Sequence, residues 1–234
     1  MPSPFKTPWH FDNFKVDKEG EYVKIIGKFQ GDWDDDVRNA RLLGLSTKKY
    51  NAQSYEHAAN KPSFNHEMED AENLYGQPDA PIFEKMDITK YPGKLLAFEK
   101  IINSLHIDTT KSFTFKFHDQ LPNQQLMWHI DNLPGKPRKE RVIDNQDFKY
   151  QDPNMVRFLI MLNDWEPGQV VQFGSIVYTQ WAEGTAITWE WSTLPHITWN
   201  GSWERRPALQ LTGYATEATW DLITKGNKDS IYKI

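Results

Sequence analysis

The clearest pattern in the sequence is a series of short segments with alternating apolar and polar residues, beginning at residue 111. The segment "KSFTFKFH" at 111–118 places Phe113, Phe115 and Phe117 on one face and polar residues on the other. This period of two is expected of a strand with one buried face. Further segments rich in β-branched and aromatic residues follow, each bounded by Gly, Pro, Asn or Asp: "QLMWHID", "MVRFLIML", "QVVQFGSIVYTQW", "TAITWEW", "HITWN" and "ALQLTGYATEATW". Many short strands joined by turns predict a β-sandwich or barrel.

The first 110 residues have a different pattern. Residues 21–30 have strand character, and "GDWDDDVRNARLLGLS" at 31–46 predicts a short helix. Residues 50–92 have few periodic apolar positions, which predicts long surface loops with at most one helical turn. Residues 93–106 carry apolar side chains at helical spacing after a Pro-Gly pair, so we expect a helix packed on a sheet.

The length of 234 residues suits one large domain. We expect a single domain over 1–234, in which an α/loop region at 1–110 covers the barrel. The barrel itself is expected at 111–216, and a C-terminal tail at 217–234.

Composition and charge narrow the classes of function. The formal net charge is −5, and the longest basic run is the short "KPRKER" at 136–141, so no nucleic-acid partner is expected. The absence of cysteine excludes disulfides, thiolate zinc sites, iron–sulfur clusters and a cysteine nucleophile. Any metal must therefore be held by nitrogen and oxygen ligands. Because no secretory pattern or membrane-length apolar stretch is present, we expect a cytoplasmic protein without a membrane partner.

A histidine and an aspartate separated by one residue occur twice, in "WHFDN" at 9–13 and in "WHIDN" at 128–132. Residues i and i+2 of a strand point to the same face, so His129 and Asp131 can present an imidazole and a carboxylate together. They also follow a predicted strand and precede a turn. His10 and Asp12 have no predicted strand before them, and surface exposure or local capping explains them.

Two later residues complete a candidate metal site. His196 lies at the entry of the predicted strand in "HITWN", and two histidines with one carboxylate leave three octahedral positions open. That set suits non-haem Fe(II), although zinc can use the same ligands. Ten residues later, Arg206 begins the next predicted strand, where its guanidinium can hold a carboxylate. Arg205 points to the other face and replaces Arg206 if the register differs by one residue.

The combination of His129-x-Asp131, His196 and Arg206 resembles the 2-oxoglutarate/Fe(II)-dependent oxygenases. Within them it is most similar to the aspartyl/asparaginyl β-hydroxylase or prolyl-hydroxylase-like branch. The resemblance covers about residues 111–216 and is carried by four segments: "FHDQLPNQQLMWH", "VRFLIML", "WAEG" and "HITWNGSWERR". It implies a mainly β fold, a double-stranded β-helix (jelly roll, cupin-like) with flanking N-terminal helices and loops.

The same resemblance implies a dioxygenase that hydroxylates a C–H bond of an amino-acid, peptide or protein side chain. Its cofactors would be Fe(II), 2-oxoglutarate as cosubstrate, and O2. His129, Asp131 and His196 would be the metal ligands and the catalytic residues. Arg206 would bind the distal carboxylate of 2-oxoglutarate, with Arg157 and His118 as further cosubstrate contacts.

Two other functions fit the same residues. In a non-catalytic cupin-like protein, the two histidines and Asp131 would hold a structural or regulatory metal. In a metal-dependent isomerase they would act without oxygen or 2-oxoglutarate. A small-molecule or peptide substrate is the expected partner of either enzyme.

Overall fold

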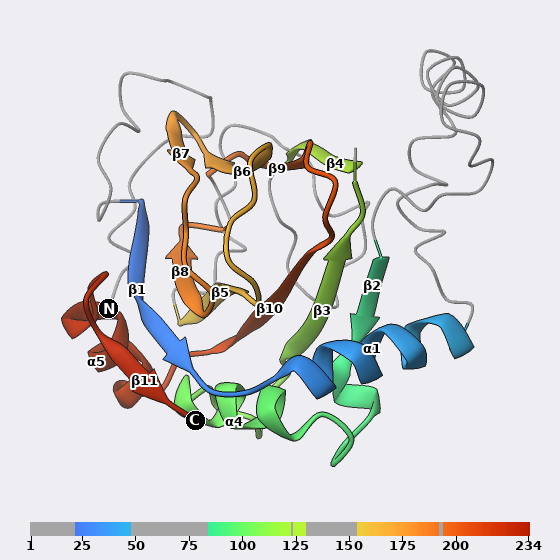
Figure 1. Cartoon of the computed structure of the whole chain (residues 1–234). Coiled ribbons are helices and arrows are strands. Elements are labelled where there is room, and N and C mark those ends of the chain that lie inside the picture. The colour runs from blue at the N-terminus through green and yellow to red at the C-terminus, as the bar shows by residue number, and fades with distance from the viewer. Residues whose placement is uncertain (1–21, 48–83, 123, 130–153, 192–193) are drawn as a thin grey trace, which may run out of the picture.

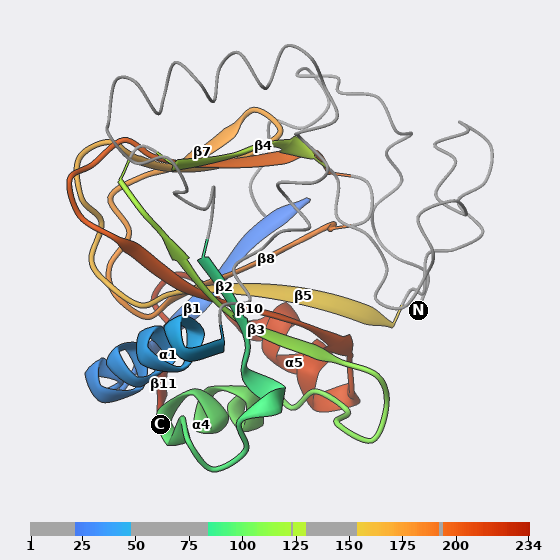
Figure 2. The same ribbon diagram turned by 90° about the vertical axis from the view of Figure 1, so that its right-hand side faces the viewer.

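The protein consists of two facing β-sheets with helices on one side (Figure 1). The computed structural model describes residues 22–47, 84–122, 124–129, 154–191 and 194–234. The larger sheet has the order β11-β1-β8-β5-β10-β3-β2 and the smaller sheet the order β4-β9-β6-β7. Figure 2 shows the smaller sheet lying across the larger one, with the helices on the far side of the larger sheet.

The strands of the larger sheet are β1 (Val23–Gln30), β2 (Glu84–Asp87), β3 (Thr114–Gln120), β5 (Met155–Met161), β8 (Thr185–Trp189), β10 (Arg206–Tyr214) and β11 (Ile231–Lys233). Those of the smaller sheet are β4 (Gln124–His129), β6 (Gln169–Phe173), β7 (Ile176–Tyr178) and β9 (His196–Asn200). The helices are α1 (Asp34–Thr47), η1 (Ile88–Lys90, a 3-10 turn), α4 (Leu96–Ser104) and α5 (Glu217–Lys225). None of the helices in the described ranges is long and apolar enough to cross a membrane.

The strands from β3 to β10 form the double-stranded β-helix, so the predicted fold class is confirmed. β3, β10, β5 and β8 are neighbours in the larger sheet, while β4, β9, β6 and β7 form the smaller one. Every pairing among these eight strands is antiparallel. The chain therefore crosses from one sheet to the other several times, and residues distant in sequence meet between the sheets.

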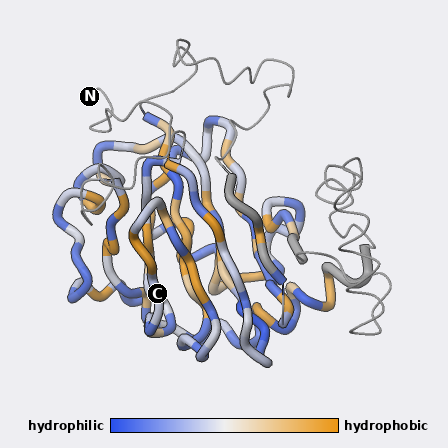
Figure 3. The backbone as a smooth tube through the Cα atoms, turned by 90° about the horizontal axis from the view of Figure 1, so that it is seen from above, coloured by the Kyte–Doolittle hydropathy of each residue, from blue (hydrophilic) through white to orange (hydrophobic). Residues whose placement is uncertain are grey.

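Alternating side chains on the larger sheet enter two separate cores. On β5, Phe158 and Ile160 pack with the helices, whereas Leu159 and Met161 pack between the two sheets. Both faces of β5 are thus buried, which explains why "MVRFLIM" is nearly continuously apolar. Figure 3 shows apolar residues, in orange, recurring along the strands.

The N-terminal region differs in part from the prediction. The helix predicted at 93–106 is α4, which occupies Leu96–Ser104. Its Ncap residue Leu95 makes no side-chain cap, but the carboxylate of Asp36 in α1 accepts a hydrogen bond of 3.0 Å from the N–H of Phe98. This bond satisfies one of the free N–H groups in the first turn of α4. The end of the segment predicted as surface loop contains the single helical turn η1 and also β2, which the sequence pattern did not predict.

Both ends of the described chain add to the larger sheet. β1 lies between β8 and β11, so strands outside 111–216 extend the sheet beyond the barrel. The segment "ALQLTGYATEATW" was predicted as one strand, but β10 ends at Tyr214. Thr216 then forms a reciprocal cap with Thr219 and begins α5.

Gly184, in the "WAEG" turn before β8, provides a test of close backbone packing against β1 in the larger sheet. It has φ +81°, and a Cβ here would lie 2.0 Å from the carbonyl oxygen of Phe29. Gly184→Ala is therefore expected to lower the free energy of unfolding by about 3 kcal/mol or more, since left-handed strain and a backbone clash add. Gly93 has φ +73°, but a Cβ at this position would meet no atom within 4 Å, so Gly93→Ala should cost only about 1 kcal/mol. Urea unfolding of both variants measures the difference, and equal losses would contradict the clash.

Candidate functional site

The two predicted metal histidines are placed opposite each other by strand pairing. β4 and β9 are antiparallel neighbours, and His129 is the cross-strand partner of His196. The register shifts between Leu126 and His129, which indicates a bulge just before the end of β4. Such bulges are frequent beside active sites because they change the direction in which a strand presents its residues. The side chain of His129 and the whole of Asp131 lie outside the described residues.

His196 is buried, with 4% of its surface exposed, and its ring is held on three sides. The ring stacks on Phe173, with centroids 5.6 Å apart, and meets the edge of Trp189 at 5.3 Å. Its Nδ1 lies 3.2 Å from the carbonyl oxygen of Leu194. Because a carbonyl can only accept, Nδ1 must carry the proton, and in the neutral ring Nε2 then carries the lone pair. A backbone carbonyl that orients a histidine in this way is the usual support of a metal-ligating imidazole.

Arg206 is the most deeply buried cation among the described residues, with 2% of its surface exposed. Its Nε and Nη2 donate to Oε1 of Gln120 at 2.9 and 2.6 Å, while Nη1 has no hydrogen-bond partner in the described part of the chain. Burial lowers the pKa of Arg206 to about 10, so the guanidinium remains protonated at neutral pH. A buried positive charge held by a neutral amide is an unusual arrangement, because such charges are normally paired.

The carboxylate that precedes Gln120 on β3 is already used elsewhere. Asp119, fully buried on β3, accepts from Arg41 at 2.8 Å and from Arg205 at 2.6 Å. Arg205 therefore points to the opposite side of the sheet from Arg206, as the period of two predicts. No ion pair is formed by Arg206 within the described residues.

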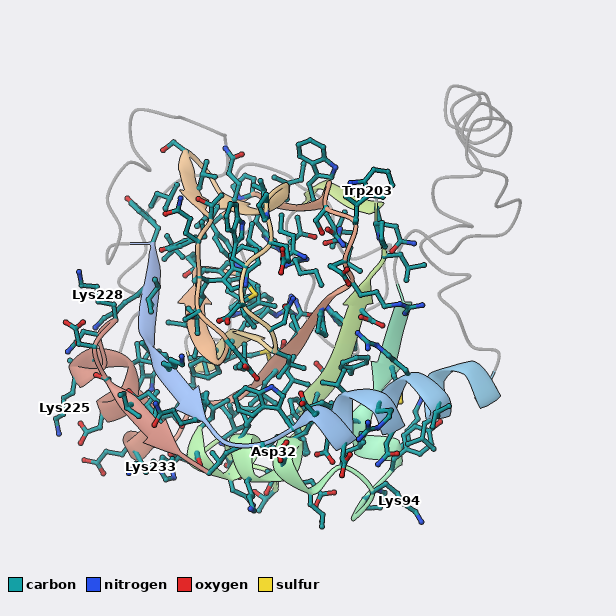
Figure 4. The ribbon with its side chains drawn as sticks, viewed as in Figure 1. Asp32, Lys94, Trp203, Lys225, Lys228 and Lys233 are labelled. Atoms are coloured by element: carbon teal, nitrogen blue, oxygen red, sulfur yellow. The ribbon has the colours of Figure 1, made fainter. Side chains whose placement is uncertain are left out.

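A cavity between the two sheets brings several of these residues together. Three residues proposed from the sequence, His118, His196 and Arg206, contribute to its wall. The full lining comprises His118, Leu126, Leu159, Val171, Phe173, Trp189, His196, Thr198, Arg206, Ala208 and Gln210. The wall is thus mostly apolar, with polar groups from β3, β9 and β10, as in many small-molecule sites. Figure 4 shows side chains from both sheets directed into the space between them, whereas Trp203 stands on the outer side near β4.

The remaining predicted residues have different positions. His118 faces the cavity while Phe115 and Phe117, on the other face of β3, pack with the helices. Arg157 is buried but is not part of the cavity wall. It donates to the hydroxyl of Thr212 at 2.6 Å, and its guanidinium lies 5.0 Å from the ring centroid of Trp191. Its role as a cosubstrate contact stays a prediction.

Sequence reasoning missed two residues, one that contacts Arg206 and one that lines the same cavity. Gln120 is two residues after His118 and shares its face, and strand pairing places it directly opposite Arg206. Thr198 is two residues after His196, and its side chain lines the cavity. The period of two alone could have placed each on the face of its neighbouring histidine, but the contact of Gln120 with Arg206 depends on the pairing of β3 and β10.

The turn between β9 and β10 positions Arg206 at the start of β10. Asn200 is fully buried and donates to the carbonyl oxygens of Gln120 and Glu204 at 2.9 and 2.8 Å. Its Oδ1 accepts from the hydroxyl of Ser202 at 2.7 Å. Asn200 therefore organises the turn by hydrogen bonds to its neighbours.

Within the described residues, no group of three histidine, aspartate or glutamate side chains could hold a metal ion. This follows from the position of the predicted ligands, since only His196 of the three has a described side chain. His196 nevertheless fits a metal ligand in burial, orientation and tautomer. The chemistry of the donor set, two imidazoles and a carboxylate, suits Fe(II).

The chain was also compared with known proteins. No protein-family model matches it, and no curated protein does. Among solved structures it is similar to a prolyl-4-hydroxylase from Pseudomonas putida, at 15% identity over 57% of this chain and 71% of that one, with a TM-score of 0.39. It is also similar to the Cupin_2 domain of an XRE family transcriptional regulator from Enterobacter cloacae, at 10% identity over 58% and 99%, with a TM-score of 0.34.

A third similar structure is a sugar phosphate isomerase from a cupin superfamily in Silicibacter pomeroyi, at 8% identity over 45% of this chain and 52% of that one, with a TM-score of 0.30. The topology of the two sheets is that of a double-stranded β-helix. These three similar proteins differ in activity, and fold likeness alone does not transfer any of those activities to this chain.

Proposed function

We propose that the protein is an Fe(II)- and 2-oxoglutarate-dependent dioxygenase that hydroxylates a C–H bond of an amino-acid, peptide or protein side chain. The observation that carries the proposal is Arg206. Its buried guanidinium has no carboxylate partner in the described residues and shares one cavity with His196. A dicarboxylate in that cavity would satisfy the guanidinium at one end and approach the metal position at the other.

Three residues would hold the iron. His196 presents Nε2 for coordination because Leu194 fixes its Nδ1 proton. The pairing of β4 with β9 supports His129 as the second ligand, since directly opposite residues of an antiparallel pair share a face. Asp131, two residues later, is the third proposed ligand. When bound, Fe(II) with 2-oxoglutarate and O2 supplies the oxidant for hydroxylation, and 2-oxoglutarate leaves as succinate and carbon dioxide.

The protein's own contribution is orientation and exclusion of water. Phe173 and Trp189 fix the plane of His196 and line the cavity with apolar surface. Arg206 and Gln120 form a rigid unit on neighbouring strands, so that a bound ketoacid would be held in one pose. His118 lines the same cavity and is proposed as a further cosubstrate contact.

Anaerobic reconstitution tests this function. Fe(II) and 2-oxoglutarate together should give a weak visible charge-transfer band that neither gives alone. Admission of air should then give slow formation of succinate without added substrate. Iron binding without the band and without succinate would favour the metal-binding cupin instead, and turnover without oxygen would favour the isomerase.

A further inference from the structure

The outer face of the smaller sheet is the surface turned away from the cavity and from the larger sheet. On β9 the side chains of His196, Thr198 and Asn200 are buried, whereas the alternating residue Trp199 is 49% exposed. Strand pairing places Val170 of β6 opposite Trp199, so both lie on this outer face. The described helices all lie beyond the larger sheet (Figure 2), so none of them covers it.

Two tryptophans are exposed where β9 leads into β10. Trp203, in the turn that follows Trp199, is 91% exposed and is the most exposed large apolar side chain in the described part of the chain. Figure 4 shows it on the outer side of the smaller sheet, near β4. Val177, on the edge strand β7 of the same sheet, is 52% exposed. Such a group of exposed apolar side chains is typical of a binding surface.

The backbone holds the indole of Trp199 in place. A Cβ at Gly201 would lie 2.9 Å from Cζ2 and 3.1 Å from Cε2 of Trp199, so the indole rests directly on this glycine. The N–H of Gly201 donates to the carbonyl oxygen of Gly168 at 2.9 Å, which ties this backbone to the start of β6. A ring that is already fixed loses little conformational entropy when a ligand stacks on it.

Charge indicates the kind of partner. None of the four strands of the smaller sheet contains Asp, Glu, Lys or Arg, although 25% of the whole chain is charged. The two charged residues that follow Trp203, Glu204 and Arg205, have opposite signs, and Arg205 pairs with Asp119. A phosphate backbone or a charged protein surface would meet no complementary charge on these strands. The face therefore fits an uncharged partner.

The size of the face favours a small partner over a second copy of the chain. Four strands about 4.8 Å apart, with about five residues each at about 3.3 Å per residue, cover roughly 14 by 16 Å. A standard interface between two proteins buries about 800 Å² on each side, which is several times that area. A short oligosaccharide is of the size of the face.

The same face also carries an oriented amide. Gln172, on β6, is partly exposed, and its Nε2 donates to the carbonyl oxygen of Gly174 at 2.8 Å. This bond fixes the plane of the amide, whose Oε1 can accept a hydrogen bond from a hydroxyl.

We propose that Trp199 and Trp203 form a stacking platform for a neutral oligosaccharide, with Gln172 as a hydrogen-bonding partner of its hydroxyls. A pyranose ring has an apolar face of C–H groups and a rim of hydroxyls, so indole rings match the first and an amide matches the second. This surface is separate from the cavity and needs no metal. The inference therefore does not depend on the proposed dioxygenase function, and each can fail without the other.

Calorimetric titration of the metal-free full chain tests the platform. The probes are two neutral glucose hexamers, the β-linked cellohexaose and the α-linked maltohexaose. At least one should bind with a dissociation constant on the order of 1 mM or lower, and the affinity should change less than about 2-fold between about 50 and 500 mM NaCl. Trp199→Ala and Trp203→Ala should each weaken binding by about 10-fold or more, because each removes a stacking ring. Gly201→Ala keeps both indoles but displaces that of Trp199, so it should weaken binding by about 3-fold or more.

Leu96→Ala is the matched control, since Leu96 is 61% exposed on α4, on the far side of the larger sheet. It should bind the hexamer within about 2-fold of the wild type. Trp203 is almost fully exposed, so Trp203→Ala decides if Trp199→Ala or Gly201→Ala does not fold. Binding of neither hexamer, or wild-type affinity in both tryptophan variants, would overturn the inference. Dimerisation seen by sedimentation equilibrium, abolished by both tryptophan substitutions and without sugar binding, would assign the face to a second copy instead.

Discussion

His196→Ala is expected to lower the affinity for Fe(II) by at least about 100-fold and to abolish formation of succinate. Loss of a group that merely orients a ligand costs about 10- to 100-fold in metal affinity, so loss of a direct ligand should cost more. His196 is a strong candidate for such a ligand because Leu194 fixes its tautomer, and Phe173 and Trp189 fix its plane. Iron content after anaerobic reconstitution and dialysis measures the effect.

A second histidine provides the control. His106 is exposed, lies after α4 and has a positive φ of 54°. Asparagine tolerates that backbone conformation, so His106→Asn removes an imidazole without strain. Its iron content should equal that of the wild type. If His196→Ala retained as much iron as the wild type, His196 would not be a metal ligand, and the oxygenase proposal would be contradicted.

The strands of the barrel could be predicted because their pattern is local. In "KSFTFKFH" the alternation alone separates Phe115 and Phe117 from His118, and the structure places them on opposite faces of β3. The same logic separates Arg205, which pairs with Asp119, from Arg206, which enters the cavity. The alternation of side chains and the face of the strand on which each lies depend only on a few neighbouring residues, so they can be predicted from one sequence.

Features that depend on long-range pairing could not be predicted. Gln120 and Arg206 are 86 residues apart, and only the register of β3 with β10 brings them together. Without that register, nothing in the sequence distinguishes Gln120 from the other glutamines as a site residue. β2 was missed for a different reason, because "EKMD" has one apolar side chain in four and becomes a strand only by pairing with β3.

The described residues bring three of the predicted site residues together. His118, His196 and Arg206 meet in one cavity, and the backbone of His129 lies opposite His196. The carboxylate of Asp131 and the segment "KPRKER" lie outside the described residues.

Arg206→Met is expected to produce the largest loss of 2-oxoglutarate binding of any substitution on β10. Removing one partner of a buried, hydrogen-bonded charge pair costs about 2–5 kcal/mol, which corresponds to roughly 30- to 5,000-fold in affinity. The methionine keeps an apolar stem of similar length, so the cavity wall is changed mainly in charge. Calorimetric titration with 2-oxoglutarate of protein loaded with Mn(II), which substitutes for iron without turnover, measures the dissociation constant. Arg205→Gln, which changes the opposite face of the sheet, is the control and should bind 2-oxoglutarate within about 3-fold of the wild type.

The same substitution should have the opposite effect on stability. In the free protein the guanidinium of Arg206 is desolvated without a carboxylate partner in the described residues, and this burial lowers its pKa to about 10. An unpaired buried charge carries a desolvation cost that an apolar side chain does not, and this offsets the two donors that Oε1 of Gln120 loses. Arg206→Met should therefore melt at the same temperature as the wild type or higher in the absence of ligand, and 2-oxoglutarate should raise the melting temperature of the wild type only. A variant that melts much earlier, with 2-oxoglutarate affinity retained, would mean that Arg206 holds the sheets together and does not bind the ketoacid.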